Sequence, residues 1–232
     1  MRYNKDIVSL DDYVRDAIDR VLEEVRAPLD GTLRGLAGAI ATEARAADVR
    51  FADAMRLIDE APSLSDVLNA LAACVGREVE RSAVLVVAPG RLRGWHSSGF
   101  GGAAADARTI ELSSDAGGLV GAALGAKAMV VSLASTASTP ADDRPPFAQG
   151  ANLRDAAAAP VVLGGTVAAV VYVDASPVSG ESPSWVAAVN RLTRYAGLVL
   201  EVRTARYLTG APLDSPAHGV SGGSRGASGG LR

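Results

Sequence analysis

Apolar residues in the first quarter of the chain recur at helical spacing. Between residues 11 and 60 they stand alternately four and three positions apart, among many Ala, Arg, Asp and Glu residues. This alternation places an apolar row along the face that meets another helix, as in a coiled coil. The first row contains Val14, Ile18, Val21 and Val25, and the second contains Leu33, Ala37, Ile40, Ala44, Ala47, Phe51, Ala54 and Ile58. The rows are one position out of phase, so we expect the helix to break or kink near Pro28, between them.

Two interpretations of these rows are open. In one, the two halves form a helical hairpin that covers a core within the monomer. In the other, which we favour, the helix pairs with a second subunit. Either way, residues 1–61 are assigned to a helical, coiled-coil-like N-terminal extension. A second helix is expected to begin at Ser63, which can cap it with Asp66 three residues later.

After residue 82 the spacing changes to that of β-strands. Residues 82–88 form a continuous apolar strand, and residues 91–98 form a more polar strand with Trp95 and His96. Between them we expect a wider loop, because a type II turn at Pro89-Gly90 twists poorly for a tight hairpin. Further along we predict a strand at 109–113, a short helix capped by Asp115, a strand at 128–133 and a long mobile loop at 134–152.

The strongest local signal is the sequence VVLGGTVA at residues 161–168. Its two glycines, between β-branched runs, supply the positive φ angles that a two-residue hairpin turn requires. A long helix is then expected from Ser182-Pro183 to about Leu208. Its apolar residues repeat the four-three spacing: Trp185, Val189, Leu192, Ala196 and Val199. The remaining residues, 209–232, are rich in Gly and Ser and are expected to be disordered.

This order of elements predicts an α+β protein: an antiparallel sheet flanked by N- and C-terminal helices. Residues 62–208 would form the domain, and residues 209–232 its tail. The formal net charge of −3 argues against a general nucleic-acid binder, because contact with phosphates needs a clustered basic surface. The single cysteine, Cys74, excludes an internal disulfide and cysteine-based zinc sites. It lies among apolar residues of the second helix, so a buried, inert thiol is expected.

Membrane and secretion signals are absent from the apolar pattern. The longest apolar runs are well short of the roughly 20 residues that a membrane helix needs. The first 16 residues lack the apolar core of a signal peptide. We therefore expect a cytoplasmic protein.

Several segments between residues 64 and 208 follow one another in a familiar order. A helix leads into AVLVVA, a Trp-containing strand ends in SSGFGG, and IELSSDAGGLVGAALGAKAMVVS, NLRDAAAAPVVLGGTVAAVVYVD and WVAAVNRLTRYAGLVLEVRTARYL follow. Together they resemble a GAF domain, a small-ligand and signal-sensing domain related to PAS domains. The resemblance implies a pocket between the sheet and the short helix, and pairing of subunits through the opening and closing helices.

Departures from the family's better-known types leave the ligand and any cofactor open. The Asn-Lys of cyclic-nucleotide-binding GAF domains occurs only at Asn4-Lys5, outside the domain. Methionine-sulfoxide-reducing relatives use several cysteines, and one cysteine cannot run that cycle. Cys74 does not match the chromophore-bearing cysteine of phytochromes. His96 is the only histidine in the domain, and a solvent-facing strand histidine is the simpler interpretation than a haem ligand.

The sequence thus predicts two sets of functional residues. The expected ligand pocket is formed by Trp95, Phe100, Ile110, Leu119 and Val131. The expected homodimer interface is formed by Leu33, Ile40, Phe51, Ile58 and Leu192. No catalytic or metal-binding residue is proposed, and we expect a protein that is not an enzyme. The favoured function is a stand-alone sensor of a small-molecule ligand that signals to a protein partner through its flanking helices. The alternative is a ligand-free scaffold for dimerisation or for docking to another protein.

Overall fold

The computed structural model describes residues 10–134, 143–149, 154–176 and 183–209 of the 232-residue chain. The chain divides into two compact units, Met1–Leu57 and Ile58–Arg232. We call them unit 1 and unit 2 and describe each by itself. The predicted tail at 209–232 lies almost entirely outside the described residues, as does much of the predicted mobile loop at 134–152.

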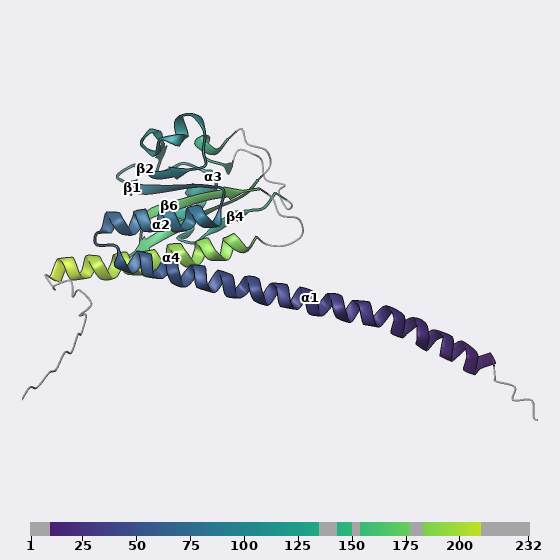
Figure 1. Cartoon of the computed structure of the whole chain (residues 1–232). Coiled ribbons are helices and arrows are strands. Elements are labelled where there is room, and N and C mark those ends of the chain that lie inside the picture. Colours follow the sequence, from purple (N-terminus) through teal and green to yellow (C-terminus); the bar gives the residue numbers. More distant parts are fainter. Residues whose placement is uncertain (1–9, 135–142, 150–153, 177–182, 210–232) are drawn as a thin grey trace, which may run out of the picture. The chain divides into compact units, whose positions relative to one another are not determined.

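A single helix, α1 (Leu10–Glu60), makes up the described part of unit 1 and enters unit 2 at its last residues. The helix runs through Pro28 without interruption (Figure 1), so the predicted break there is wrong. A proline removes one backbone hydrogen-bond donor, and the bonds before and after it maintain a helix of this length. Leu33 and Ile40 are exposed, as are Leu36 and Val49.

Unit 2 is built on a six-stranded sheet with the order β3-β2-β1-β6-β5-β4, in which every neighbouring pair is antiparallel. The strands are β1 (Arg81–Ala88), β2 (Arg91–Ser98), β3 (Glu111–Ser113), β4 (Val130–Ser132), β5 (Asp155–Leu163) and β6 (Thr166–Ala175). The two longest strands, β5 and β6, lie near the centre, and the three-residue strands β3 and β4 form the edges. The predicted α+β class with an antiparallel sheet is therefore confirmed.

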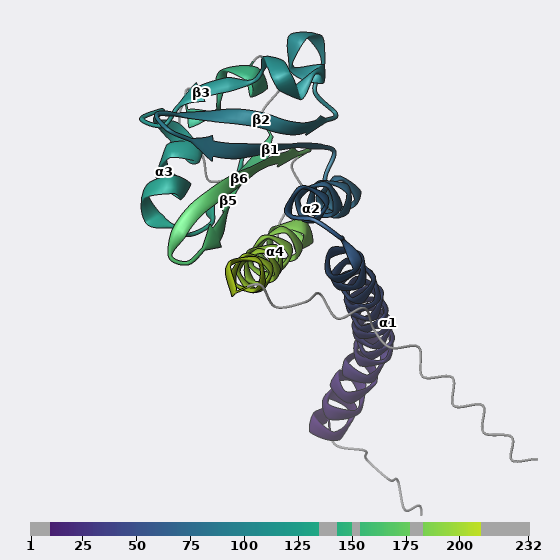
Figure 2. The ribbon, with the colours of Figure 1, turned by 90° about the vertical axis from the view of Figure 1, so that its left-hand side faces the viewer.

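Helices cover both faces of the sheet. The helices α2 (Leu64–Glu78) and α4 (Ser184–Thr209) pack side by side on one face, which we call the helical face (Figures 1 and 2). The other face, here the outer face, carries α3 (Gly118–Ala126) and the short 3-10 turns η1 (Gly102–Ala105), η2 (Ala107–Thr109) and η4 (Pro146–Ala148). Side chains alternate between the two faces along each strand. Leu85 of β1 and Tyr172 of β6, for example, belong to the core under the outer face.

Glycine turns set the two central hairpins. Gly164 and Gly165 join β5 to β6 with φ angles of +55° and +78°, which confirms the predicted two-residue turn. The connection between β1 and β2 is also only two residues long, because Ala88 pairs directly with Arg91. The expected wider loop is therefore wrong. Gly90 accommodates the tight turn with a φ of +72°.

The smaller elements differ from prediction at their ends. Ser63 caps α2 as expected, since its Oγ accepts a hydrogen bond from the backbone N–H of Asp66. The residue before α3 is Gly117 rather than Asp115, and β4 is shorter than the predicted strand at 128–133. Ile58 is fully buried and belongs to unit 2, so the compact domain begins slightly before the predicted boundary at residue 62.

Candidate functional site

Three aromatic rings meet on the outer face of the sheet. Phe100 follows β2, Phe147 lies in η4 and Tyr172 belongs to β6. The ring centres of Phe100 and Phe147 are 5.3 Å apart and those of Phe147 and Tyr172 are 5.5 Å apart, both in edge-to-face geometry. Phe100 and Tyr172 are 6.3 Å apart. Rings in this range attract one another through edge and face charges, so the cluster joins three segments far apart in sequence.

A buried ion pair lies beside these rings. Asp174, whose side chain is fully buried, accepts two hydrogen bonds from Arg81, from Nε to Oδ1 and from Nη2 to Oδ2, each 2.5 Å long. The guanidinium carbon of Arg81 also lies 4.9 Å from the centre of the Phe100 ring, within the range of a cation–π interaction. Arg81 therefore connects the aromatic cluster with Asp174.

The network extends from Asp174 to the segments that join the sheet to its helices. Arg154 Nε donates to Asp174 Oδ1 at 3.0 Å, and Arg154 Nη2 donates to Glu80. Glu80 lies between α2 and β1, and it also accepts hydrogen bonds from the N–H and the hydroxyl of Ser176, just after β6. The hydrogen bond from Arg154, and then that from Ser176, lower the pKa of Glu80 below its ordinary value.

Tyr172 contacts the same network from within the aromatic cluster. Its hydroxyl donates to Asp174 Oδ2 over 3.4 Å. Burial and then the negative charge of Asp174 raise the pKa of Tyr172 above its ordinary value. The phenol therefore stays protonated and acts as a hydrogen-bond donor, not as a base.

A surface hollow of about 340 Å³ opens beside Phe147 on the outer face. Most of its lining is apolar or small, and the single charged residue is Glu111, which is ion-paired with Arg91 at 2.9 Å. The lining residues are Gly101, Ala103, Ala104, Thr109, Ile110, Glu111, Leu112, Pro146 and Phe147. The hydroxyl of Thr109 already donates to the carbonyl oxygens of Ala103 and Asp106. Such a surface suits an apolar, uncharged group better than an anion.

The structure brings together three of the five predicted pocket residues. Phe100, Ile110 and Leu119 are all buried in the core under the outer face, and Ile110 also lines the hollow. They lie in packed core, so only Ile110 contacts the open space.

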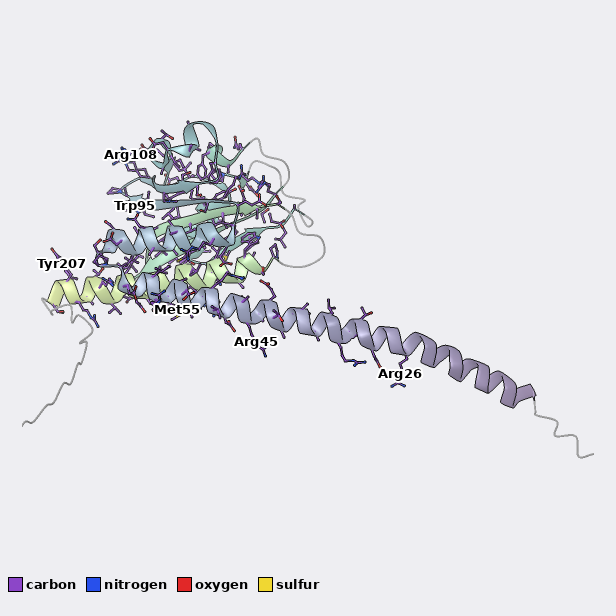
Figure 3. All side chains as sticks on the ribbon, in the orientation of Figure 1. Arg26, Arg45, Met55, Trp95, Arg108 and Tyr207 are labelled. Atoms are coloured by element: carbon purple, nitrogen blue, oxygen red, sulfur yellow. The ribbon has the colours of Figure 1, made fainter. Side chains whose placement is uncertain are left out.

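Trp95 and Val131 lie elsewhere. Trp95 is 40% exposed, and its Nε1 donates to Asn69 Oδ1 of α2, on the helical face (Figure 3). Val131 is opposite Ala157 in the register and is exposed, whereas its neighbour Val130 packs against the outer-face core. The assignment of these two residues to a pocket on the outer face is therefore wrong.

The sequence analysis missed the most distinctive residues of this site. Phe147 lies in the segment predicted to be a mobile loop, and Tyr172 and Asp174 lie at the end of a strand whose main sequence signal is its apolar run. An aspartate that ends a buried strand, in a domain with several arginines near strand ends, was the available signal. A buried carboxylate needs such a partner.

The predicted dimer residues also separate into two groups. Leu33 and Ile40 on α1 are 60% and 63% exposed, and Phe51 is partly buried. Ile58 and Leu192 are 0% and 2% exposed, because they pack inside unit 2. Their assignment to a dimer interface is wrong: the four-three row of α4 faces the domain's own core, from Trp185 to Ala196.

The side of α4 that points away from the sheet carries exposed apolar residues. Leu198 and Val202 are exposed there, and Tyr207 extends from the end of the helix (Figure 3). Two hollows flank Leu198, with volumes of about 520 and 630 Å³. At the first, the hydroxyl of Tyr195 donates to Asp59 Oδ2 at 2.6 Å, and Arg203 donates to the Asp59 carbonyl oxygen at 2.6 Å. Burial, and then the hydrogen bond to Asp59, raise the pKa of Tyr195 to about 12.

Other chemistry has little support among the described residues. Within this part of the chain no three His, Cys, Asp or Glu residues are grouped as a metal site would require. Cys74 is buried, and burial raises the pKa of its thiol, which disfavours the reactive thiolate. None of the helices described has the length and apolar character needed to cross a bilayer.

Comparison with known proteins identifies the fold. Neither a protein-family model nor a curated protein matches the chain. Among solved structures, the GAF domain of an Acinetobacter phosphoenolpyruvate-protein phosphotransferase is 18% identical with a TM-score of 0.51, over 67% of this chain and 93% of that one. Unit 2 is a GAF-like domain.

Other solved structures similar to the GAF-like domain belong to different proteins. A methyl-accepting chemotaxis protein, over its residues 122 to 287, is 17% identical with a TM-score of 0.51, over 67% of this chain and 98% of that one. Free methionine-R-sulfoxide reductase from Neisseria meningitidis, solved with its substrate, is 12% identical with a TM-score of 0.52, over 67% and 89% of the two chains. At these identities the likeness concerns the fold alone.

Proposed function

We propose that the chain is a regulatory protein in which the GAF-like domain senses a small, largely apolar molecule and passes the change to its helices. The observation that carries this proposal is a continuous path of contacts. It begins at Phe147, which lines the hollow, and leads through Phe100 and Arg81 to Asp174. From there Arg154 leads to Glu80, between α2 and β1.

Such a path can transmit a small displacement because each contact depends on geometry. A ligand beside Phe147 would change the ring packing with Phe100, and Arg81 rests on that same ring. Glu80 accepts hydrogen bonds from both Arg154 and Ser176. It therefore fixes the segment that follows α2 to the end of β6. If this network has two alternative arrangements, a switch between them would change how the helices of the helical face are held against the sheet.

The output would be a change in how two copies of the chain associate. In unit 1, α1 exposes Leu33, Leu36 and Ile40 within two turns. A long helix with an exposed apolar row is marginal alone in water and is stabilised by pairing with another helix. A homodimer would cover this row, and the methyl-accepting chemotaxis protein is a precedent for a similar fold in a signalling protein.

Native mass spectrometry of the purified protein tests ligand binding. The wild type is expected to carry an additional small mass that organic denaturation releases. Ala103→Trp, at an exposed position lining the hollow, should abolish the additional mass, whereas Ala105→Trp, exposed on the same turn but outside the lining, should retain it. Retention in both variants would contradict binding in this hollow.

One observation favours the alternative function, a scaffold without ligand. Phe100, Phe147 and Tyr172 fill the space between the sheet and the outer layer with the protein's own side chains. A domain without room for a ligand would act only through its association with a second copy or with another protein. A dimeric wild type without any bound mass would favour the scaffold over the sensor. Under either function we propose that the protein is not an enzyme.

A further inference from the structure

Leu198 is an exposed apolar side chain in the middle of the surface that α4 turns away from the sheet. It is 61% exposed and lines the hollows on both sides of the helix. The larger hollow, of about 630 Å³, also has Met129, Pro160 and Val162 in its lining. A leucine that stands beside an apolar hollow forms the ridge and groove into which a second helix packs.

The sheet prevents α4 from turning to bury this leucine. Gly197, the residue before it, has no room for a side chain, because a Cβ there would lie 2.6 Å from the carbonyl oxygen of Val162. On the side that faces the sheet, Ala196 and Leu200 are buried in the domain's core. Rotation of the helix would break these contacts, so Leu198 stays exposed within its own domain.

The larger hollow contains charges of both signs on the same side of α4. Arg194 stands one turn before Leu198, and Glu201 about one turn after it. Within the part of the chain that the structure describes, neither residue forms an ion pair. The hollow's other charged residue is Lys127, whose Nζ donates to the carbonyl oxygen of Gly165 at 2.6 Å. The hollow thus presents an unpaired cation and an unpaired anion about 10 Å apart along the helix.

The hollow on the other side of Leu198 favours neither sign of charge. Its acidic residues are Asp59 and Glu60, and its basic residues are Arg203 and Arg206. Arg203 already donates to the carbonyl oxygen of Asp59. The choice of a partner therefore depends on the larger hollow, with Arg194 and Glu201.

A second α4 that runs in the opposite direction is complementary to this pattern. A twofold axis midway between Arg194 and Glu201 brings Arg194 of one copy opposite Glu201 of the other, and does so twice. Leu198 lies next to that axis, so the two leucines meet at the centre. The same axis places Arg191 opposite Thr204 and not opposite another charge. A parallel pair would instead set Arg194 against Arg194 and Glu201 against Glu201, which costs binding free energy.

We propose that two copies of the GAF-like domain associate through α4, with the two helices antiparallel about Leu198. The inference rests on the proposed homodimer and adds a contact that uses residues of unit 2 alone. Each Leu198 is covered by the α4 of the other copy. The Arg194–Glu201 pairs on either side of the axis select the antiparallel direction.

Single charge reversals test this arrangement in the full-length protein. Arg194→Glu gives each copy two acidic residues at the contact, and Glu201→Arg gives each copy two arginines. Each variant alone should weaken dimerisation at least about tenfold in sedimentation equilibrium, because like charges then meet on both sides of the axis. Mixed in equal amounts, the two variants should form a heterodimer, since every charge at the contact again meets one of opposite sign.

Matched controls make the same charge changes away from α4. Arg108→Glu in η2 and Asp115→Arg in the turn after β3 are at exposed positions (Figure 3 labels Arg108). Both variants should dimerise as the wild type does. A change in net charge alone would weaken dimerisation in the controls as well, and equal weakening in the two sets would contradict a specific contact through α4.

Cysteine cross-linking measures the direction of the two helices. Leu198→Cys should form a disulfide between copies under mild oxidation, because the two positions meet near the axis. Ala205→Cys, exposed on the same side of α4, should not, since antiparallel helices place it about 22 Å along the axis from its own copy. The native Cys74 is buried and should not interfere.

The outcomes separate failure of this contact from failure of the homodimer. Reversed variants that dimerise as the wild type does would show that another segment covers Leu198. A mixture that stays monomeric, or a disulfide at Ala205→Cys, would exclude the antiparallel direction. Each of these results would overturn the α4 contact while leaving the homodimer intact. A monomeric wild type would overturn both.

Discussion

Arg81 holds Asp174 through two parallel hydrogen bonds of 2.5 Å, and both belong to strands at the centre of the sheet. Arg81 is opposite Asp174 in the β1–β6 register, so the backbone pairing of the two strands and the ion pair between the two side chains reinforce each other. The carboxylate is fully buried and the guanidinium is largely buried. Buried charges tolerate the loss of a partner poorly.

Replacing Arg81 should therefore be costly. Arg81→Met leaves Asp174 with Arg154 as its remaining ion-pair partner and removes the cation from the Phe100 ring. We expect the free energy of unfolding in urea to fall by about 3 kcal/mol. Arg91→Met, which breaks the exposed pair with Glu111, is the matched control and should cost less than about 1 kcal/mol. Equal losses in the two variants would show that the Arg81 pair is no more than a surface contact.

Gly99 and Gly90 offer a second matched comparison. Their φ angles are +77° and +72°, so an alanine is strained at either position by about 1–2 kcal/mol. A Cβ at Gly99 would in addition lie 2.1 Å from the carbonyl oxygen of Glu80, whereas nothing lies within 4 Å of one at Gly90. Thermal unfolding should therefore show Gly99→Ala to be clearly less stable than Gly90→Ala. If both variants melt alike, the close approach of Gly99 to Glu80 is absent in solution.

We predict that Tyr195 makes the stability of the folded protein depend on pH in the alkaline range. Its pKa of about 12 in the folded protein exceeds the ordinary 10, so the folded state retains the phenolic proton longer than the unfolded chain does. The resulting stabilisation is complete below pH 10 and is lost as the pH rises through about 12. Tyr195→Phe should reduce stability at neutral pH by about 1 kcal/mol and flatten this alkaline loss. Tyr207→Phe, at an exposed position, is the control, and an unchanged slope for Tyr195→Phe would contradict the assigned hydrogen bond.

Ile40 and Ile58 belong to the same apolar row of α1 but should respond differently to a charge. Ile40 is exposed, so Ile40→Asp should leave the GAF-like domain folded by circular dichroism while weakening self-association in light scattering. Ile58 is fully buried, and Ile58→Asp should destabilise the domain by several kcal/mol because an unpaired carboxylate enters the core. A fully dimeric Ile40→Asp variant would remove this part of α1 from the interface.

The sequence was sufficient for the elements whose signals are local. The Gly164-Gly165 turn needs positive φ angles, which two glycines supply, and the structure has them. Likewise, the capping pair Ser63 and Asp66 marks the start of α2. Such local signals, taken in order along the chain, predict the succession of strands and helices and with it the GAF-like fold.

Positions that depend on distant neighbours were not predictable in the same way. The register between β1 and β2 shifts so that Val84 pairs with His96 and Leu85 with Gly94, which leaves Trp95 as an extra residue. Such a bulge breaks the alternation of faces along β2, so residue spacing alone does not tell on which face Trp95 lies. For Leu192, the four-three spacing identifies an apolar row but not what covers it. In this protein, the domain's own core covers it.

Amide hydrogen exchange, followed by mass spectrometry, tests the path from the hollow to the helices most directly. Ala103→Trp fills the hollow in place of a ligand, and Ala105→Trp is the control on the same turn. We predict that Ala103→Trp changes exchange at Glu80 and Ser176, at the far end of the network, and that Ala105→Trp leaves both at wild-type rates. Unchanged exchange at these residues in Ala103→Trp, with the fold intact, would contradict the coupling between the hollow and the helices.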